Sequence, residues 1–108
     1  MPRVVIGSGT SPASAWQQYT GGGGPGIFID VDTSHALFPE RPTYVCSLHG
    51  SSEHWDTTGG SSIYNPTETG FRVYVRRTNG TAITPQDAEA NGWHIEWMGQ
   101  FIERVHIT

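Results

Sequence analysis

Two segments of this 108-residue chain carry side chains suited to binding a polar ligand. In residues 51–60 a tryptophan stands among serine, threonine, glycine and charged residues, and in residues 70–77 arginine and tyrosine alternate with apolar residues. An aromatic ring can pack against the apolar face of a sugar, while arginine forms paired hydrogen bonds with neighbouring hydroxyl groups. The predicted ligand is therefore a carbohydrate. The predicted ligand-binding residues are His54, Trp55, Asp56, Arg72, Tyr74 and Arg76.

Both segments also have a purely structural interpretation. The ring of Trp55 could fold back over one end of the protein and close its core. The Arg72 and Tyr74 side chains could instead contact a second subunit, because arginine and tyrosine are enriched in protein interfaces as well as in ligand sites. The alternative function is thus a structural or assembly module whose arginine and tyrosine face is a subunit interface.

No metal site, cofactor or catalytic site is predicted. Asp30 and Asp32 share one strand face, but no oxygen-rich calcium loop accompanies them. His49, His54 and His94 lack the close spacings of common zinc motifs. The chain contains no nucleophile elbow, glycine-rich phosphate loop or Cys/His motif, so we expect a binding protein and not an enzyme.

The elements that must position these residues are mostly strands. Fourteen glycines, seven prolines and 15% charged residues disfavour helices, and β-branched and aromatic residues occur in short runs between Gly and Pro. This pattern predicts an all-β fold, a small antiparallel β-sandwich of six to seven strands. One short helix is expected over residues 85–91, with Thr84 as its cap, Pro85 in its first turn and Gly92 at its end.

Residues 70–97 determine where the polar side chains are expected to point. Residues 70–76 and 92–97 both alternate, with the turn-forming pair Asn79-Gly80 after the first run, which predicts two neighbouring strands. Apolar residues including Trp93 and Trp97 would then face the core. The side chains expected together on the opposite face are Arg72, Tyr74, Arg76, His94 and Glu96.

The chain length fits a single domain over residues 1–108. Residues up to about 26 are expected to form a flexible N-terminal arm and a glycine-rich loop, with loose strands near residues 3–6 and 15–19. Further strands are expected at 27–32, 43–48 and 61–64. The last segment, 93–107, is expected to be a strand with a bulge at Gly99, after which the alternation resumes out of phase at Phe101, Glu103, Val105 and Ile107.

Charge and cysteine content limit the partners and the compartment. The net charge is −4 and all six basic residues are arginine, so nucleic acid is not an expected partner. Cys46 has no second cysteine to pair with and is expected to be a buried, inert thiol, compatible with the cytoplasm. The apolar run at residues 4–6 is too short for a signal peptide or a membrane span. We expect a soluble protein whose localisation is unknown.

Several short motifs follow one another in the order found in a known family. They are the Pro-containing segment at 38–50, Ile63-Tyr64, the Thr-Glu-Thr-Gly-Phe signature at 67–71 and the Trp-His-Ile-Glu-Trp-Met element at 93–98. Over residues 27–99 the chain resembles H-type lectin domains. This resemblance implies a six-stranded antiparallel sandwich that trimerises and binds galactose or N-acetylgalactosamine, with weak single sites strengthened by avidity.

The chain departs from the family at the sugar-binding strand. Where snail-type members carry a Trp-His pair, this sequence has residues 76–79, Arg-Arg-Thr-Asn. The family's sugar-binding pair is therefore not carried over, and the helical segment 85–91 is an insertion relative to the family pattern.

Overall fold

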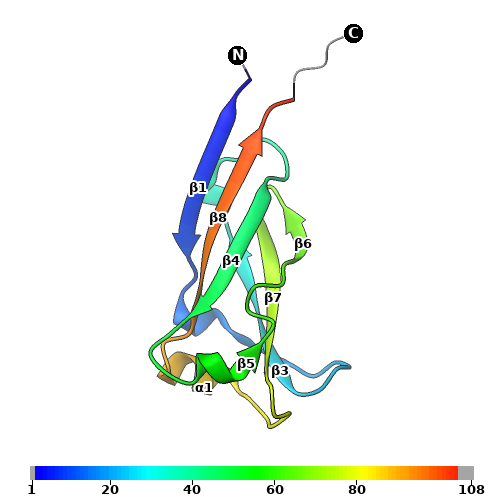
Figure 1. Cartoon of the computed structure of the whole chain (residues 1–108), viewed down its shortest axis with the longest axis vertical. Coiled ribbons are helices and arrows are strands. Elements are labelled where there is room, and N and C mark those ends of the chain that lie inside the picture. Colours follow the sequence, from blue (N-terminus) through cyan, green and yellow to red (C-terminus); the bar gives the residue numbers. More distant parts are fainter. Residues whose placement is uncertain (1, 105–108) are drawn as a thin grey trace.

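The structure is a two-layer sandwich of antiparallel β-sheets, as the sequence predicts (Figure 1). It is a computed structural model that describes residues 2–104. Sheet A contains three strands in the order β1 (Val4–Thr10), β8 (His94–Ile102) and β4 (Thr43–His49). Sheet B contains β2 (Gln17–Tyr19), β3 (Gly26–Asp32), β7 (Gly70–Arg77) and β5 (Thr57–Thr58), with β6 (Tyr64–Thr67) also paired to β7. The described residues thus form eight strands, and the strand that the sequence did not indicate is the two-residue β5.

The core lies between the two sheets and is built by alternation along the strands. In β3, β7 and β8 every second side chain is buried, because successive side chains point to opposite faces of a strand. Trp93 and Trp97 both point inward, as predicted, and Trp16 joins them. The apolar residues that these strands bury are Ile27, Ile29, Val31, Phe71, Val73, Val75, Ile95 and Trp97.

The strands on either side of Asn79-Gly80 do not pair with each other, so the expected shared face of Arg72 and His94 is wrong. The strand β7 pairs with β3 in sheet B, while β8 lies between β1 and β4 in sheet A. The turn at Asn79-Gly80 is present, with a φ of 78° at Gly80, but the chain then continues into a helix and not into a returning strand. Arg72 and Tyr74 therefore lie on the outer face of one sheet, and His94 and Glu96 on that of the other.

The helix α1 (Pro85–Ala90) confirms the signals in the sequence. The Thr84 hydroxyl accepts a hydrogen bond from the backbone N–H of Asp87, and the Asp87 carboxylate accepts one from the backbone N–H of Thr84. Gly92 follows the helix with a φ of 63°, a conformation that favours glycine. Within residues 2–104, no helix has the length and apolar composition that crossing a membrane requires.

The N-terminal segment is a full strand of the sandwich and not a flexible arm. The strand β1 pairs with β8 over seven consecutive residues, from Val4 opposite Ile102 to Thr10. Its inward positions include Gly7 and Gly9, and a Cβ atom at Gly9 would lie 3.1 Å from the ring of Trp97. Gly7 and Gly9 therefore allow β1 to lie close over its neighbours.

The predicted bulge at Gly99 is absent from the described part of β8. Pairing continues without a shift through Gly99 on both sides, opposite Gly7 and Tyr44. The rings of Phe38 and Tyr44 occupy the space beside Gly99, where a Cβ atom would lie 2.7 Å from Phe38. Phe101 therefore stays in phase with Trp97, and the expected positions of residues 105 and 107 lie outside the described residues.

The short strand that the sequence places at 61–64 begins only at Tyr64. Its pairing with β7 contains a register shift between Tyr64 and Thr67, and Asn65 has a φ of 53° within it. This irregular backbone turns β6 along the edge of β7, so that Tyr64 lies opposite Arg72.

A buried tyrosine hydroxyl connects the two sheets. Tyr44, from β4 of sheet A, donates a 2.7 Å hydrogen bond to the carbonyl of Thr67 in sheet B. The same hydroxyl lies 2.7 Å from Oγ1 of Thr33, which is fully buried just after β3. Burial raises the pKa of the Tyr44 hydroxyl, so the group stays neutral.

Replacing Tyr44 by phenylalanine is expected to lower the free energy of unfolding by about 1–3 kcal/mol, because it leaves two polar partners unsatisfied. The matched control is Tyr64→Phe, at an exposed tyrosine, which should change stability by less than about 0.5 kcal/mol. Urea unfolding followed by tryptophan fluorescence measures both. Equal midpoints for the two variants would show that the Tyr44 hydroxyl does not hold the sheets together.

Candidate functional site

Three tyrosines meet on the outer face of sheet B. Tyr74 lies in the middle of β7, Tyr19 ends β2 and Tyr64 begins β6. The Tyr74 ring makes edge-to-face contacts with the other two, with centroid distances of 5.1 Å to Tyr19 and 5.0 Å to Tyr64. This edge-to-face geometry is favourable between aromatic rings.

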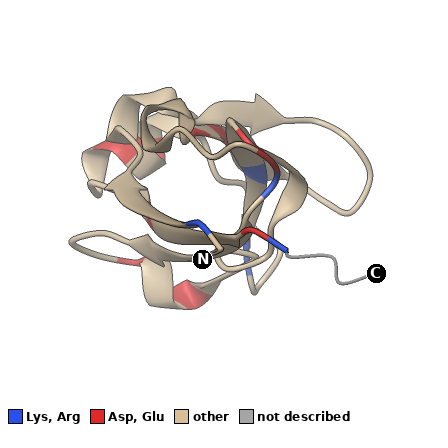
Figure 2. Cartoon of the chain, turned by 90° about the horizontal axis from the view of Figure 1, so that it is seen from above, with Lys and Arg blue, Asp and Glu red and all other residues tan. Residues whose placement is uncertain are grey.

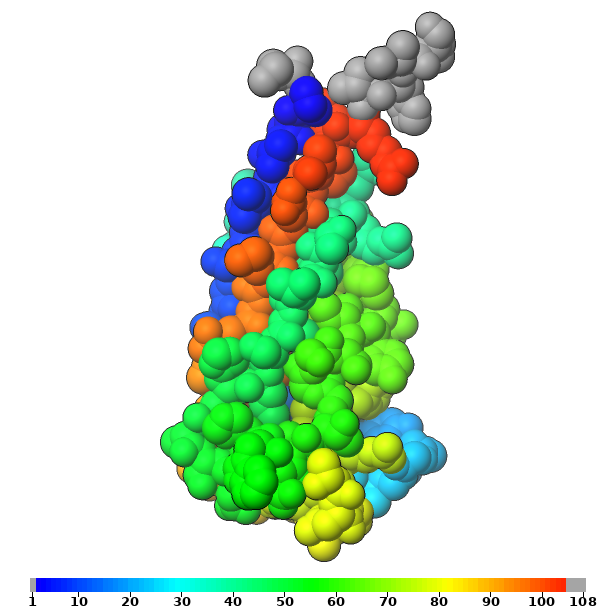
Figure 3. All heavy atoms as spheres, viewed as in Figure 1, coloured from blue at the N-terminus to red at the C-terminus, as the bar shows by residue number. Residues whose placement is uncertain are grey.

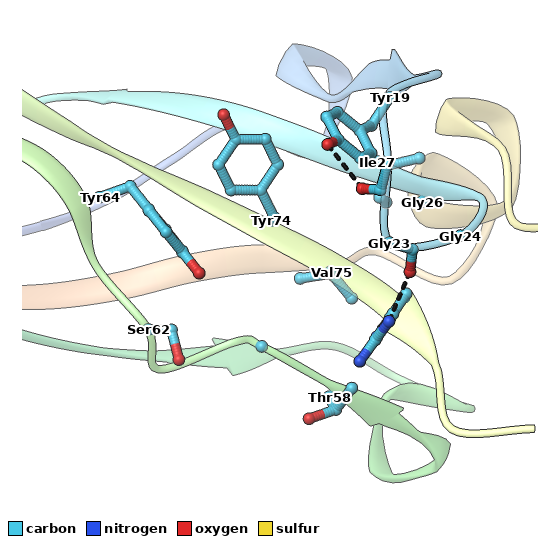
Figure 4. A pocket seen from close by; sticks show the side chains of 13 residues that line it. Tyr19, Gly23, Gly24, Gly26, Ile27, Thr58, Ser62, Tyr64, Tyr74 and Val75 are labelled. Carbon is cyan, nitrogen blue, oxygen red and sulfur yellow. Dashed lines mark hydrogen bonds between the residues drawn. The ribbon is translucent and has the colours of Figure 1, made fainter. Parts of the chain in front are cut away.

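The tyrosines border a hollow of about 470 Å³ (Figure 4). The glycine-rich turn between β2 and β3 forms one wall, and the segment from Thr58 to Ser62 forms the opposite wall. Its volume lies within the range of small-molecule sites. The residues that line it are Tyr19, Gly22, Gly23, Gly24, Gly26, Ile27, Thr58, Gly59, Ser62, Tyr64, Tyr74, Val75 and Arg76.

Two side chains fasten the glycine-rich turn over this hollow. The hydroxyl of Tyr19 donates a 2.8 Å hydrogen bond to the carbonyl of Gly22, and the guanidinium of Arg76 donates to the carbonyl of Gly23 (Figure 4). Gly23 and Gly24 have φ values of 98° and 99°, which side-chain-bearing residues rarely adopt. The glycines thus permit the turn, and Tyr19 and Arg76 hold it in place.

Arg72 supports the aromatic group and is not a free ligand donor. Its guanidinium forms two hydrogen bonds with the Asp30 carboxylate, at 2.7 and 2.9 Å, and lies 4.3 Å from the centroid of the Phe28 ring. It also donates to the Tyr74 hydroxyl at 3.3 Å. The hydrogen bonds to Asp30 and then to Tyr74 raise the pKa of Arg72 further above its usual value. Arg72 therefore remains charged and orients Tyr74.

The structure brings together only half of the six predicted ligand residues. Arg72, Tyr74 and Arg76 lie in a row on the outer face of β7, and of these Tyr74 and Arg76 line the hollow. The other three form the 3₁₀ turn η3 (His54–Asp56), whose residues do not line the hollow.

Trp55 points into solvent. The residue is 86% exposed, so the structural interpretation in which its ring closes one end of the core is wrong. Trp93 takes that role instead, because it is fully buried and donates a 2.7 Å hydrogen bond to the carbonyl of Ser52. Asp56 accepts a 3.0 Å hydrogen bond from the Thr78 hydroxyl, and Nδ1 of His54 is buried without a hydrogen-bond partner among the described residues.

The two aspartates of β3 are engaged in local hydrogen bonds. Asp30 binds Arg72 as described, and Asp32 accepts a 2.9 Å hydrogen bond from the backbone N–H of Ser34. Hydrogen bonding to Ser34 lowers the pKa of the Asp32 carboxyl.

Sequence reasoning missed Tyr19, Tyr64 and the glycine-rich turn as parts of one site. The available signal was Tyr19 two residues before the glycine run, since binding residues are frequently found in and next to loops. The position of Tyr64 could not be predicted from the sequence, because it depends on the register shift in β6.

Comparison of the chain with protein-family models, with curated proteins and with solved structures finds no match. The resemblance to H-type lectin domains therefore stays a prediction that rests on the motifs themselves.

Cys46 is half-buried in β4, with its Sγ 3.6 Å from the carbonyl of Gly60. Burial raises the pKa of its thiol to about 11. At pH 8 we therefore expect the folded chain to react with an aromatic disulfide reagent roughly a hundred times more slowly than the urea-unfolded chain, because only the thiolate attacks. Equal rates in the two states would show that the thiol is accessible and readily ionised.

Proposed function

We propose that the protein is a non-catalytic carbohydrate-binding module whose site is the hollow on the outer face of sheet B. The observation that carries this proposal is the group of three tyrosines around a cavity of sugar-compatible size. The fold class agrees with that of the H-type lectin domains, which the motifs resemble. By this resemblance the expected ligand is galactose or N-acetylgalactosamine.

The lining of the hollow offers both kinds of contact that a sugar needs. The rings of Tyr64 and Tyr74 supply apolar surface for the C–H groups of a pyranose. The hydroxyls of Ser62 and Thr58 and the guanidinium of Arg76 supply hydrogen-bond partners for its hydroxyl groups. The remaining polar side chains among the lining residues described are uncharged hydroxyls, and the Arg76 guanidinium already donates to the Gly23 carbonyl, so this combination suits a polyhydroxylated sugar.

The same lining favours binding over hydrolysis. Glycoside hydrolysis ordinarily requires two carboxyl groups on either side of the scissile bond. Among the described residues that line the hollow, none carries a carboxyl group, and the nearby Asp30 is paired with Arg72.

Glycan-array screening with matched variants tests the proposal. Tyr64→Ala and Tyr74→Ala should each weaken binding at least about tenfold, because each removes a ring from the wall of the hollow. The control is Trp55→Ala, which removes an exposed aromatic ring outside the hollow and should leave binding unchanged.

Circular dichroism and thermal unfolding establish that each variant is folded. Absence of binding to every arrayed glycan would contradict carbohydrate binding. Loss of binding in Trp55→Ala with retention in Tyr64→Ala would instead locate the sugar at residues 54–56.

We propose further that copies of the chain associate with one another. The proposed contact surface is the outer face of sheet A, and not the face of sheet B that carries Arg72 and Tyr74. Figure 3 looks onto sheet A, where β1 (blue), β8 (orange) and β4 (green-cyan) lie side by side. Five apolar residues at outward positions of these strands are more than half exposed: Val4, Ile6, Val45, Met98 and Ile102. Charged residues are dispersed over both layers (Figure 2). Exposed apolar side chains gathered on one face are typical of protein contact surfaces. Association would strengthen weak sugar binding through avidity.

Met98 is central to this apolar surface, opposite Ser8 on one side and Val45 on the other. The Met98→Glu variant is expected to reduce the molar mass in multi-angle light scattering to that of a monomer, because it would bury a charge in the interface. Gln86→Glu, an added charge at an exposed position of α1, is the matched control and should leave the mass unchanged. A monomeric wild-type chain at high concentration would contradict association.

A further inference from the structure

A second group of side chains that could bind a ligand lies on the outer face of sheet A. His49 of β4 and His94 of β8 are directly opposite each other, and their rings stack with centroids 5.7 Å apart. Glu96 is two residues beyond His94 on the same strand face. Its Oε2 atom lies 2.9 Å from Nε2 of His94 and 3.3 Å from Nδ1 of His49.

Each histidine is oriented by a contact at its other ring nitrogen. Nε2 of His49 lies 2.7 Å from the hydroxyl of Ser47, which leaves Nδ1 toward Glu96. Nδ1 of His94 lies 3.0 Å from the carbonyl of Gly92, which follows α1, and this contact leaves Nε2 toward Glu96. Metal-binding histidines are commonly held by such contacts, because they fix the ring orientation and the tautomer.

The three side-chain atoms that point toward one another, Nδ1 of His49, Nε2 of His94 and Oε2 of Glu96, match the spacing of metal ligands. They all lie within 4.8 Å of one another. Bonds of about 2.0–2.1 Å in a tetrahedral zinc site place neighbouring ligand atoms roughly 3.4 Å apart. Two of the three separations here, 2.9 and 3.3 Å, are already close to that value, so small side-chain rotations would complete the set.

We propose that His49, His94 and Glu96 bind one divalent transition-metal ion, with zinc as the best match. The ligands are Nδ1 of His49, Nε2 of His94 and the Glu96 carboxylate, and a zinc ion would displace the proton that His94 shares with Glu96. Two imidazoles and one carboxylate leave one tetrahedral position open to water or an incoming group. The three residues come from two adjacent strands of a rigid sheet, which limits the reorganisation that binding requires.

This site is separate from the proposed sugar site. The metal ligands are on the outer face of sheet A, and the tyrosine hollow is on the outer face of sheet B, with the core between them. Metal binding therefore does not depend on carbohydrate binding, and each can fail without the other.

Isothermal titration of zinc chloride into the untagged, metal-stripped chain tests the proposal. We expect saturable binding of one ion per chain. His49→Ala, His94→Ala and Glu96→Gln should each weaken it at least about tenfold. His35→Ala removes a histidine outside the cluster and serves as the matched control, with unchanged zinc affinity. Tyr74→Ala should also bind zinc as the wild type does.

Circular dichroism shows whether each variant retains its fold, and cobalt(II) absorption provides a second measurement. Bound cobalt should give visible bands that change in Glu96→Gln even if that variant retains some affinity, because an oxygen ligand is altered. Absence of saturable zinc binding by the wild-type chain would overturn the proposal. Equal zinc affinity in the wild type and in all three ligand variants would overturn it as well.

Discussion

Alternation of side chains along β3, β7 and β8 is the constraint on which the rest of this structure depends. The residues that point inward form one continuous core between two sheets, so every other residue of the same strands is necessarily presented outside. A slip of one residue in β7 would exchange Val73 and Val75 for Arg72, Tyr74 and Arg76. The packing of the interior therefore also fixes the positions of the candidate binding residues.

This arrangement gives the molecule two outer faces of different chemistry. The face of sheet B carries an aromatic group supported by the Arg72–Asp30 pair and bordered by backbone groups of a glycine-rich turn. The face of sheet A carries exposed apolar residues and, at the end near α1, the cluster of His49, His94 and Glu96. A carbohydrate and a metal ion could thus be bound without competing for the same side chains.

Local signals in the sequence predicted local structure well. They did not predict which strands and side chains, distant in the sequence, contact each other in the fold. Thr84, Pro85 and Gly92 specify the helix because capping involves residues only a few positions apart. Nothing near Asn79-Gly80 reveals that β7 pairs with β3, whose paired residues are 38 to 48 positions away, since that choice depends on packing of the whole core. The bulge predicted at Gly99 was wrong for the same reason. A glycine is needed there because the rings of Phe38 and Tyr44, from distant segments, occupy the space that a side chain would fill.

The fastening of the turn between β2 and β3 has a consequence for the thermodynamics of ligand capture. A run of four glycines loses more backbone conformational entropy on ordering than other sequences of that length. Here Tyr19 and Arg76 already hold this run in place in the folded chain. The entropy lost on ordering the turn is therefore lost when the protein folds, and not when a ligand enters the hollow. Such preorganisation favours rapid association with little structural change, and it places the entropic penalty on the stability of the protein and not on the affinity of its site.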